Sequence, residues 1–119
     1  MNPEEKKVYN LFGIATKSGK LVSGEFSTEK AVKERKAALV VVAEDASDNT
    51  KKMFTNMCTY YNVQIYYFGI KDDLGHAVGK EFRASLAVLD KGLADAMEKQ
   101  LEIIQDRNGG SKYGKNEDI

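Results

Sequence analysis

Residues 38–45 read ALVVVAED, an apolar run that ends in two acidic residues. Because the aliphatic residues at 39–42 leave no polar face, this run is typical of a strand that helices cover on both sides. A β-branched and aromatic run at 63–68 and an apolar run at 85–89 also favour strands. With a shorter apolar piece at 21–23, these segments predict a small four-stranded sheet.

Helical patterns lie before, between and after these strands. Asn2 can cap a first helix that has Pro3 at its first position. The apolar stripes that predict helices are Val8, Leu11, Phe12 and Ala15; Ala31 and Val32; Met53, Phe54, Met57, Cys58 and Tyr61; Leu74, Ala77 and Val78; and Leu93, Met97, Leu101 and Ile104. The alternation of strands and helices predicts an α/β fold, a three-layer α/β/α sandwich around a small mixed sheet.

The length of 119 residues favours one domain, which we place at residues 1–104, with a flexible tail at 105–119. Hydrophobic residues make up 42% and charged residues 30% of the chain, as in soluble globular proteins. No apolar run approaches the roughly 18 residues that span a bilayer. The N-terminus, MNPEEKKVYN, does not resemble a secretory signal. We expect a cytoplasmic monomer with no membrane partner.

Few residues are suited to catalysis or metal binding. Cys58 is the single cysteine and lies on an apolar helix stripe, which favours a buried thiol and excludes an internal disulfide. His76, the single histidine, has no pattern of catalytic partners around it. Glu44, Asp45 and Asp48 follow the central strand and could hold magnesium, but a solvated turn before a helix explains them better. We therefore expect no enzymatic activity, no cofactor and no metal.

The formal net charge is zero, from 18 basic and 18 acidic side chains, but the charge is unevenly distributed. Residues 17–36 carry six basic and three acidic side chains, whereas residues 39–104 carry seven basic and ten acidic ones. In the helix predicted at 25–36, Phe26, Lys30 and Lys33 share one face. The N-terminus of that helix adds free backbone amides. This pattern fits either a small anion-binding surface or an ordinary solvated face.

Four blocks of the sequence occur in a recognisable order: KSGKLVSG at 17–24 with a lysine six residues later at Lys30, ALVVVAED at 38–45, LGHAVGKEFR at 74–83, and LAVLDKG at 86–92. With these blocks the chain resembles the L7Ae/L30e family of large-subunit ribosomal proteins. Within the family the likeness is greatest to the bacterial YlxQ-type branch of small, ribosome-associated proteins. The resemblance covers about residues 5–104 and leaves the tail outside it.

The resemblance implies an α/β/α sandwich that grips kink-turns, which are sharply bent RNA helices. In this family the N-terminus of the second helix meets base edges and backbone, and a loop before the fourth helix packs apolar side chains on bulged nucleotides. The first element matches Gly24 to Lys30. The second matches Gly69 to Gly75, with Ile70 and Leu74 as apolar contacts and Lys71 as a phosphate contact.

The sequence departs from the family's kink-turn motif, which reads Gly, any residue, Asn, Glu, two residues of any kind, then Lys. Here the segment reads Gly24-Glu25-Phe26-Ser27-Thr28-Glu29-Lys30. Phe26 can stack on a base but cannot read its edge, and Ser27 lacks the charge and reach of a carboxylate. A core position for Phe26 is an equally open interpretation. The expectation of RNA binding is therefore stronger than that of specificity for a standard kink-turn.

We expect a non-enzymatic protein that binds bent or bulged ribosomal RNA through one small face, with a salt-dependent and modest affinity. The predicted contacts are Gly24, Glu25, Phe26, Ser27, Lys30, Lys33, Ile70, Lys71 and Leu74, with Lys17 and Lys20. The alternative is a protein-interaction module that keeps the fold but no longer reads RNA.

Overall fold

The computed structural model describes residues 1–109, and within them five helices alternate with four strands as the sequence predicts. The helices are α1 (Pro3–Lys17), α2 (Glu25–Lys33), α3 (Asp48–Tyr61), α4 (Lys71–Ala77) and α5 (Lys91–Arg107). The strands are β1 (Leu21–Ser23), β2 (Leu39–Val42), β3 (Gln64–Tyr67) and β4 (Ser85–Val88). No helix among the described residues is long and apolar enough to cross a membrane.

The strands form one mixed sheet in the order β1-β4-β2-β3. β2 and β3 run parallel, with Val40 opposite Ile65, and α3 makes the crossover between them. β4 runs antiparallel to both of its neighbours, so that Ala87 lies opposite Val22 on one side and Val40 on the other. β4, the last strand in the sequence, is therefore an inner strand and joins β1 to the rest of the sheet.

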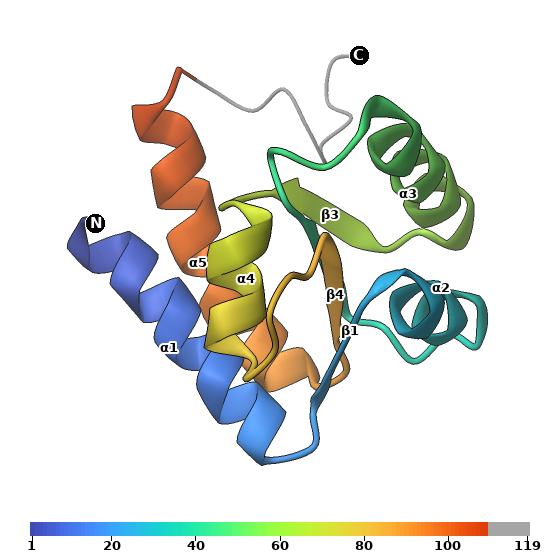
Figure 1. Cartoon of the computed structure of the whole chain (residues 1–119), viewed down its shortest axis with the longest axis horizontal. Helices are drawn as coiled ribbons and strands as arrows, with labels where there is room; N and C mark the ends of the chain where they lie inside the picture. The colour runs from blue at the N-terminus through green and yellow to red at the C-terminus, as the bar shows by residue number, and fades with distance from the viewer. Residues whose placement is uncertain (110–119) are drawn as a thin grey trace.

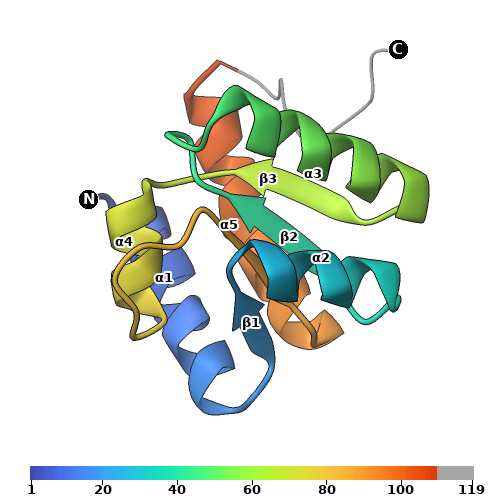
Figure 2. The same ribbon diagram turned by 45° about the vertical axis from the view of Figure 1, so that its right-hand side comes forward.

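Helices cover both faces of this sheet (Figures 1 and 2). α2 and α3 lie on one face, while α1 and α5 pack together on the other, with α4 against α1. All four residues of β2 are fully buried, because they face a helix layer on either side. This arrangement confirms the predicted three-layer α/β/α sandwich.

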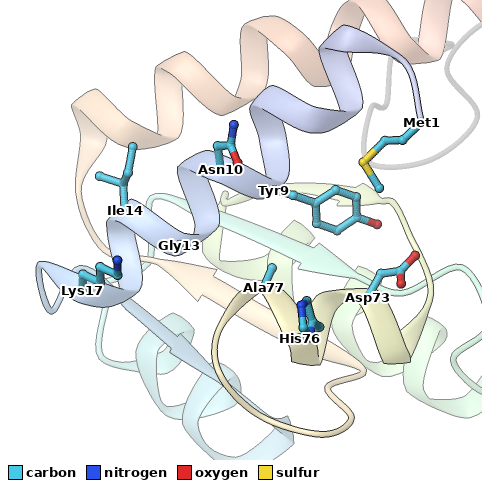
Figure 3. A pocket seen from close by; sticks show the side chains of 9 residues that line it. All are labelled: Met1, Tyr9, Asn10, Gly13, Ile14, Lys17, Asp73, His76 and Ala77. Carbon is cyan, nitrogen blue, oxygen red and sulfur yellow. The ribbon is translucent and has the colours of Figure 1, made fainter.

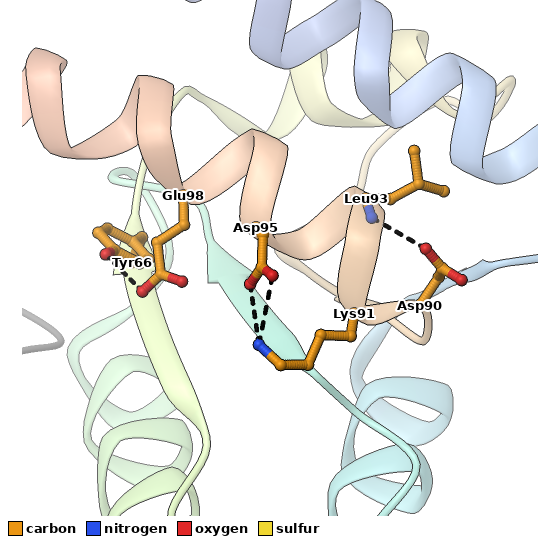
Figure 4. Close-up of polar contacts among 6 residues, drawn as sticks. All are labelled: Tyr66, Asp90, Lys91, Leu93, Asp95 and Glu98. Carbon is orange, nitrogen blue, oxygen red and sulfur yellow. Dashed lines mark hydrogen bonds and ion pairs between the residues drawn. The ribbon is translucent and has the colours of Figure 1, made fainter.

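Local polar contacts fix where the long helices begin. Asn2 forms a capping box at the start of α1: its Oδ1 accepts the Glu5 amide at 2.8 Å, and its own amide donates to Glu5 Oε1 at 3.1 Å. At the start of α5, Asp90 accepts the amide of Leu93 at 2.9 Å (Figure 4). These caps satisfy amides that have no partner within the helix.

α5 is also tied to the sheet and to α1 by side chains. The Tyr66 hydroxyl of β3 donates to Glu98 at 3.0 Å (Figure 4) and to Glu102. At the far end of α5, the Arg107 guanidinium donates to Glu4 of α1 at 2.7 Å. α5 thus continues three residues beyond its predicted end at Ile104, and the rest of the predicted tail, residues 110–119, lies outside the described residues.

Candidate functional site

The N-terminus of α2 is held against the sheet but is not capped by a side chain of the described residues. Gly24, the residue before the helix, has a φ of 96°, a conformation that favours glycine. Its amide donates to the Ser85 carbonyl of β4 at 2.9 Å. The amides of the first turn of α2 therefore lie at the end of a helix with a positive dipole, where an anion can bind.

Phe26 lies on the solvent side of this turn, with 77% of its surface exposed. The turn packs on the sheet through Thr28, which is fully buried and accepts a hydrogen bond from the Ser85 hydroxyl at 3.3 Å. Ala31 and Val32 continue the buried face of the helix. Phe26 is therefore a surface residue and not a core residue of the helix.

The predicted phosphate ligands on α2 are engaged in ion pairs along the helix. Lys30 Nζ lies 2.9 Å from Glu34, and Lys33 Nζ lies 2.8 Å from Glu29, so the carboxylate raises the pKa of Lys33. Both lysines remain half exposed. Because solvent screens exposed ion pairs of this kind, they contribute little to stability, and a phosphate can displace the carboxylates at small cost.

Lys17 and Lys20 are exposed but lie away from the start of α2. They stand at the turn between α1 and β1, whereas Gly24 follows the other end of β1. Three strand residues separate the two ends by about 10 Å. Figure 2 shows this turn and the first turn of α2 at opposite ends of β1. The structure therefore does not bring these two lysines together with the other predicted contacts.

The segment before α4 supplies fewer contacts than the sequence predicts. Ile70 is 44% exposed, and the Lys71 amide donates to Asp45 Oδ1 at 2.9 Å. Leu74 is fully buried and lies beside Gly69, where its Cδ2 is 3.3 Å from an ideal Cβ. Leu74 is thus a core residue and presents no surface to a nucleotide. Ile70 is the exposed apolar side chain of this segment.

Residues 80–84, which connect α4 to β4, lie between the two predicted segments. The Arg83 amide donates to the Lys71 carbonyl at 3.1 Å, and its Nε donates to Ser23 Oγ at 2.9 Å. The Arg83 side chain also lies 3.7 Å from an ideal Cβ at Gly24. Its neighbour Phe82 is 60% exposed. We define the α2–α4 surface as Gly24–Ser27, Ile70, Lys71, Phe82 and Arg83.

Sequence reasoning missed Phe82 and Arg83, although both belong to a block that carried the family resemblance. The signal present in the sequence was an aromatic residue next to a cation in a polar segment; the exposure of Phe82 is visible only in the structure. Their position beside Gly24 was not, because the Arg83–Ser23 contact joins residues 60 apart.

A separate groove of about 670 Å³ opens between α1 and α4 (Figure 3). Tyr9 and His76 face it from the two helices, and Asp73 lies beside the Tyr9 hydroxyl. Burial raises the pKa of that hydroxyl, and the nearby Asp73 carboxylate adds to the effect. The other lining residues are Met1, Asn10, Gly13, Ile14, Lys17 and Ala77. This groove lies on the α1 side of α4, away from α2.

Cys58 and Asp45 were considered for catalysis or metal binding, and the structure defines the surroundings of both. Cys58 is buried, as predicted, and desolvation raises the pKa of its thiol to about 12. Asp45 accepts the α4 amide described above. Within residues 1–109 no group of three or more His, Cys, Asp or Glu side chains is placed to hold a metal ion. The magnesium interpretation of Glu44, Asp45 and Asp48 therefore gains no support.

Comparison with known proteins finds one protein family and several individual proteins that this chain resembles. The family model described as "Ribosomal protein L7Ae/L30e/S12e/Gadd45 family" matches residues 6–98. The RNA-binding protein YlxQ of Bacillus subtilis (strain 168) is 39% identical over 89 residues, which cover 75% of this chain and 89% of that protein. The large ribosomal subunit protein eL30 of Methanoregula boonei is 36% identical over 85 residues, covering 70% of this chain and 84% of that protein.

A solved structure shares the fold. The 15.5 kD RNA binding protein of Giardia lamblia matches with a TM-score of 0.70 at 22% identity, covering 89% of this chain and 92% of that one. These similarities confirm the resemblance that the ordered sequence blocks indicated.

Proposed function

The chain belongs to the ribosomal protein L7Ae/L30e/S12e/Gadd45 family, and from this premise we propose that it binds structured RNA through the α2–α4 surface. The observation that carries the proposal is the open N-terminus of α2, where the first turn has no side-chain cap, the Phe26 ring is exposed, and the Arg83 side chain lies beside Gly24. The names of the B. subtilis and M. boonei relatives support RNA, and ribosomal RNA in particular, as the ligand.

Each part of this surface offers a contact that RNA can use. The amides of the first α2 turn and the Arg83 guanidinium suit phosphate oxygens. Phe26 and Phe82 are exposed rings on which unpaired bases can stack. A regular A-form helix presents phosphates but keeps its bases stacked, whereas a bend or bulge presents both. The proposed ligand is therefore bent or bulged RNA of the kink-turn type.

The chemistry of the site favours recognition by shape over recognition of base identity. Phe26 has no hydrogen-bonding group, and Ser27 carries only a hydroxyl, so neither can form a bidentate contact with a base edge. Glu25 is exposed at the same turn and opposes the approach of phosphate. We therefore expect modest affinity and a stronger dependence on the bulge than on the sequence of its flanking pairs.

Equilibrium gel-shift titration of the full chain tests this proposal. The probes are a kink-turn RNA taken from ribosomal RNA, a variant with altered flanking pairs, and a straight duplex of equal length, each at two salt concentrations. The kink-turn and its variant should bind alike and better than the duplex, and affinity should fall as salt rises. Absence of binding to every probe at low salt would refute the proposal.

Substitution of Phe26 locates the binding surface. Loss of one base-stacking contact costs about 1–3 kcal/mol, so Phe26→Ala should weaken binding by about 5-fold to 150-fold. Its thermal stability should be unchanged, because the ring is exposed. Ile103→Ala, which removes an exposed apolar side chain from α5, is the matched control and should bind normally. Equal affinity of the two variants would place the RNA on another face.

A protein-interaction module is the second candidate function. The observation that favours it is the apolar character of Phe26, Phe82 and Ile70, combined with ion pairs that neutralise Lys30 and Lys33. Under this alternative the chain binds none of the RNAs, and the same Phe26→Ala change abolishes binding to a protein partner instead.

A further inference from the structure

A second exposed aromatic group lies at the opposite end of α2, where α2 and α3 both finish. Tyr60, near the end of α3, is 79% exposed, which makes it the most exposed of the large hydrophobic side chains among residues 1–109. Its ring meets that of Tyr61 edge to face, with centroids 4.9 Å apart and an interplanar angle of 77°. Tyr61 is half-buried.

A cation is held against this aromatic pair. The Arg35 guanidinium carbon lies 5.2 Å from the centroid of the Tyr61 ring, within the range of a cation–π contact. Arg35 has a φ of 60°, and its amide donates to the Val32 carbonyl at 3.0 Å where α2 ends. No described residue forms an ion pair with it, so its charge is not neutralised. We define the α2–α3 end cluster as Tyr60, Tyr61 and Arg35.

Positive charge connects this cluster to the α2–α4 surface. Lys30 and Lys33 lie on α2 between the two, and Lys36 follows Arg35; the pairs of these lysines with Glu29 and Glu34 are exposed and readily exchanged for phosphate. With Arg35, the segment from Glu29 to Lys36 carries two more positive than negative charges. The nine residues of α2 span about 13 Å, a distance that a few nucleotides of extended strand can cover. Figure 2 shows the ends of α2 and α3 on the same side of the molecule.

The composition of the cluster favours nucleic acid over a protein partner. The other large exposed hydrophobic residues lie at the N-terminus, on α1, on α5, in the first turn of α2, or in the segments flanking α4. Tyr60 and its half-buried neighbour Tyr61 therefore form a small aromatic group and are not part of an apolar patch of a few hundred Å², the size that marks a protein interface. A flat ring beside a free guanidinium is the combination that binds a base and its phosphate.

We propose that the α2–α3 end cluster is a second RNA contact, at which an unpaired strand leaving the α2–α4 surface stacks a base on Tyr60 and places a phosphate on Arg35. This inference rests on the proposed function, since it requires RNA at the first surface. It adds that the protein prefers a bend or bulge that is flanked by single-stranded RNA.

The test compares two RNAs on the full chain. One is a short hairpin with an internal bulge, and the other is the same hairpin with a single-stranded extension of about six uridines at either end. The extension should tighten binding by about 5-fold to 30-fold. Tyr60→Ala should remove this gain and leave the affinity for the short hairpin unchanged. Tyr60→Phe is the matched control and should retain the gain, because stacking does not need the hydroxyl.

Arg35→Gly separates binding from folding. Glycine adopts a φ of 60° without strain, so the variant should be at least as stable as the wild type. It should nevertheless lose part of the gain from the extension. Photocrosslinking of the uridine extension should also label Tyr60, which mass spectrometry of the digested complex can identify.

The outcomes separate the two proposals. Failure of the wild type to bind either RNA overturns the proposed function. Binding of both RNAs with equal affinity overturns this inference alone. If Tyr60→Ala weakens the affinity for both RNAs equally, the ring acts through the fold, and this result also overturns the inference. Sedimentation velocity measures self-association of the protein. Self-association that is lost in Tyr60→Ala also overturns this inference, because the ring would then bind a second copy of the chain.

Discussion

Replacing Gly75 by alanine should destabilise the protein, although alanine is the better helix residue. Gly75 is buried in α4, and an ideal Cβ there would lie 2.3 Å from the Glu81 carbonyl oxygen and 2.9 Å from the Phe82 amide nitrogen. Both atoms belong to the backbone of the 80–84 connection, so no side-chain rotation relieves the overlap. Either the helix or the connection must move.

The magnitude follows from two opposing effects. Alanine gains about 1 kcal/mol over glycine in a helix interior. Overpacking costs about 1–3 kcal/mol, and a contact with rigid backbone belongs at the upper end of that range. The net loss for Gly75→Ala is therefore about 2 kcal/mol, which lowers the Tm by about 8 °C in a chain of this size. Because Phe82 and Arg83 move with the connection, RNA affinity should also fall, by about fivefold or more.

Gly13→Ala is the matched control. Gly13 lies inside α1, where the nearest atom to an ideal Cβ is the Ala77 carbonyl oxygen at an ordinary distance of 3.7 Å. This variant should gain about 0.5–1 kcal/mol and keep its RNA affinity. Far-UV circular dichroism with thermal and urea unfolding measures both proteins. A Gly75→Ala variant as stable as the wild type would refute the packing argument, and unchanged RNA affinity in a destabilised variant would exclude the 80–84 connection from the site.

Three further predictions concern the framework. Asn2→Ala should lower the free energy of unfolding by about 1 kcal/mol in urea titrations, because it removes the capping box of α1; no change would mean that the first turn is frayed. Arg107 holds the pKa of Glu4 below its ordinary value of 4.5, so the stabilisation should be complete above pH 4.5 and lost as the pH falls through the lower folded-state pKa. The Tm difference between the wild type and Glu4→Gln should therefore shrink from pH 7 to pH 3, and a constant difference would contradict this account. The Cys58 thiol should react with an aromatic disulfide reagent at pH 8 only after denaturant is added, since burial raises its pKa to about 12; immediate reaction of the folded protein would disprove it.

Some residues of the proposed site could be placed from the sequence, whereas the burial of others depends on tertiary packing. Gly24 and Lys30 were singled out because they match the family motif; in the structure Gly24 directly precedes α2 and Lys30 lies within it. Phe26 could not be assigned to core or surface, because its short helix offered few apolar positions from which to judge the buried face. Packing of Thr28 on β4 settles the question. Leu74 was misassigned as a nucleotide contact because the family resemblance placed it in the contacting segment, although its apolar helix stripe already indicated burial; in α4 it is a core residue.

Local patterns along the chain were sufficient for the identity of the helices and strands, the cap of α1, the buried β2 and the buried thiol. Each depends on residues within a few positions of one another, or on hydrophobicity alone. The tertiary structure decided the strand order, the place of Phe82 and Arg83 beside Gly24, and the meeting of Arg35 with Tyr61. Those features join segments that are far apart in the chain, and only the packing of the helices on both faces of the sheet determines which distant side chains become neighbours.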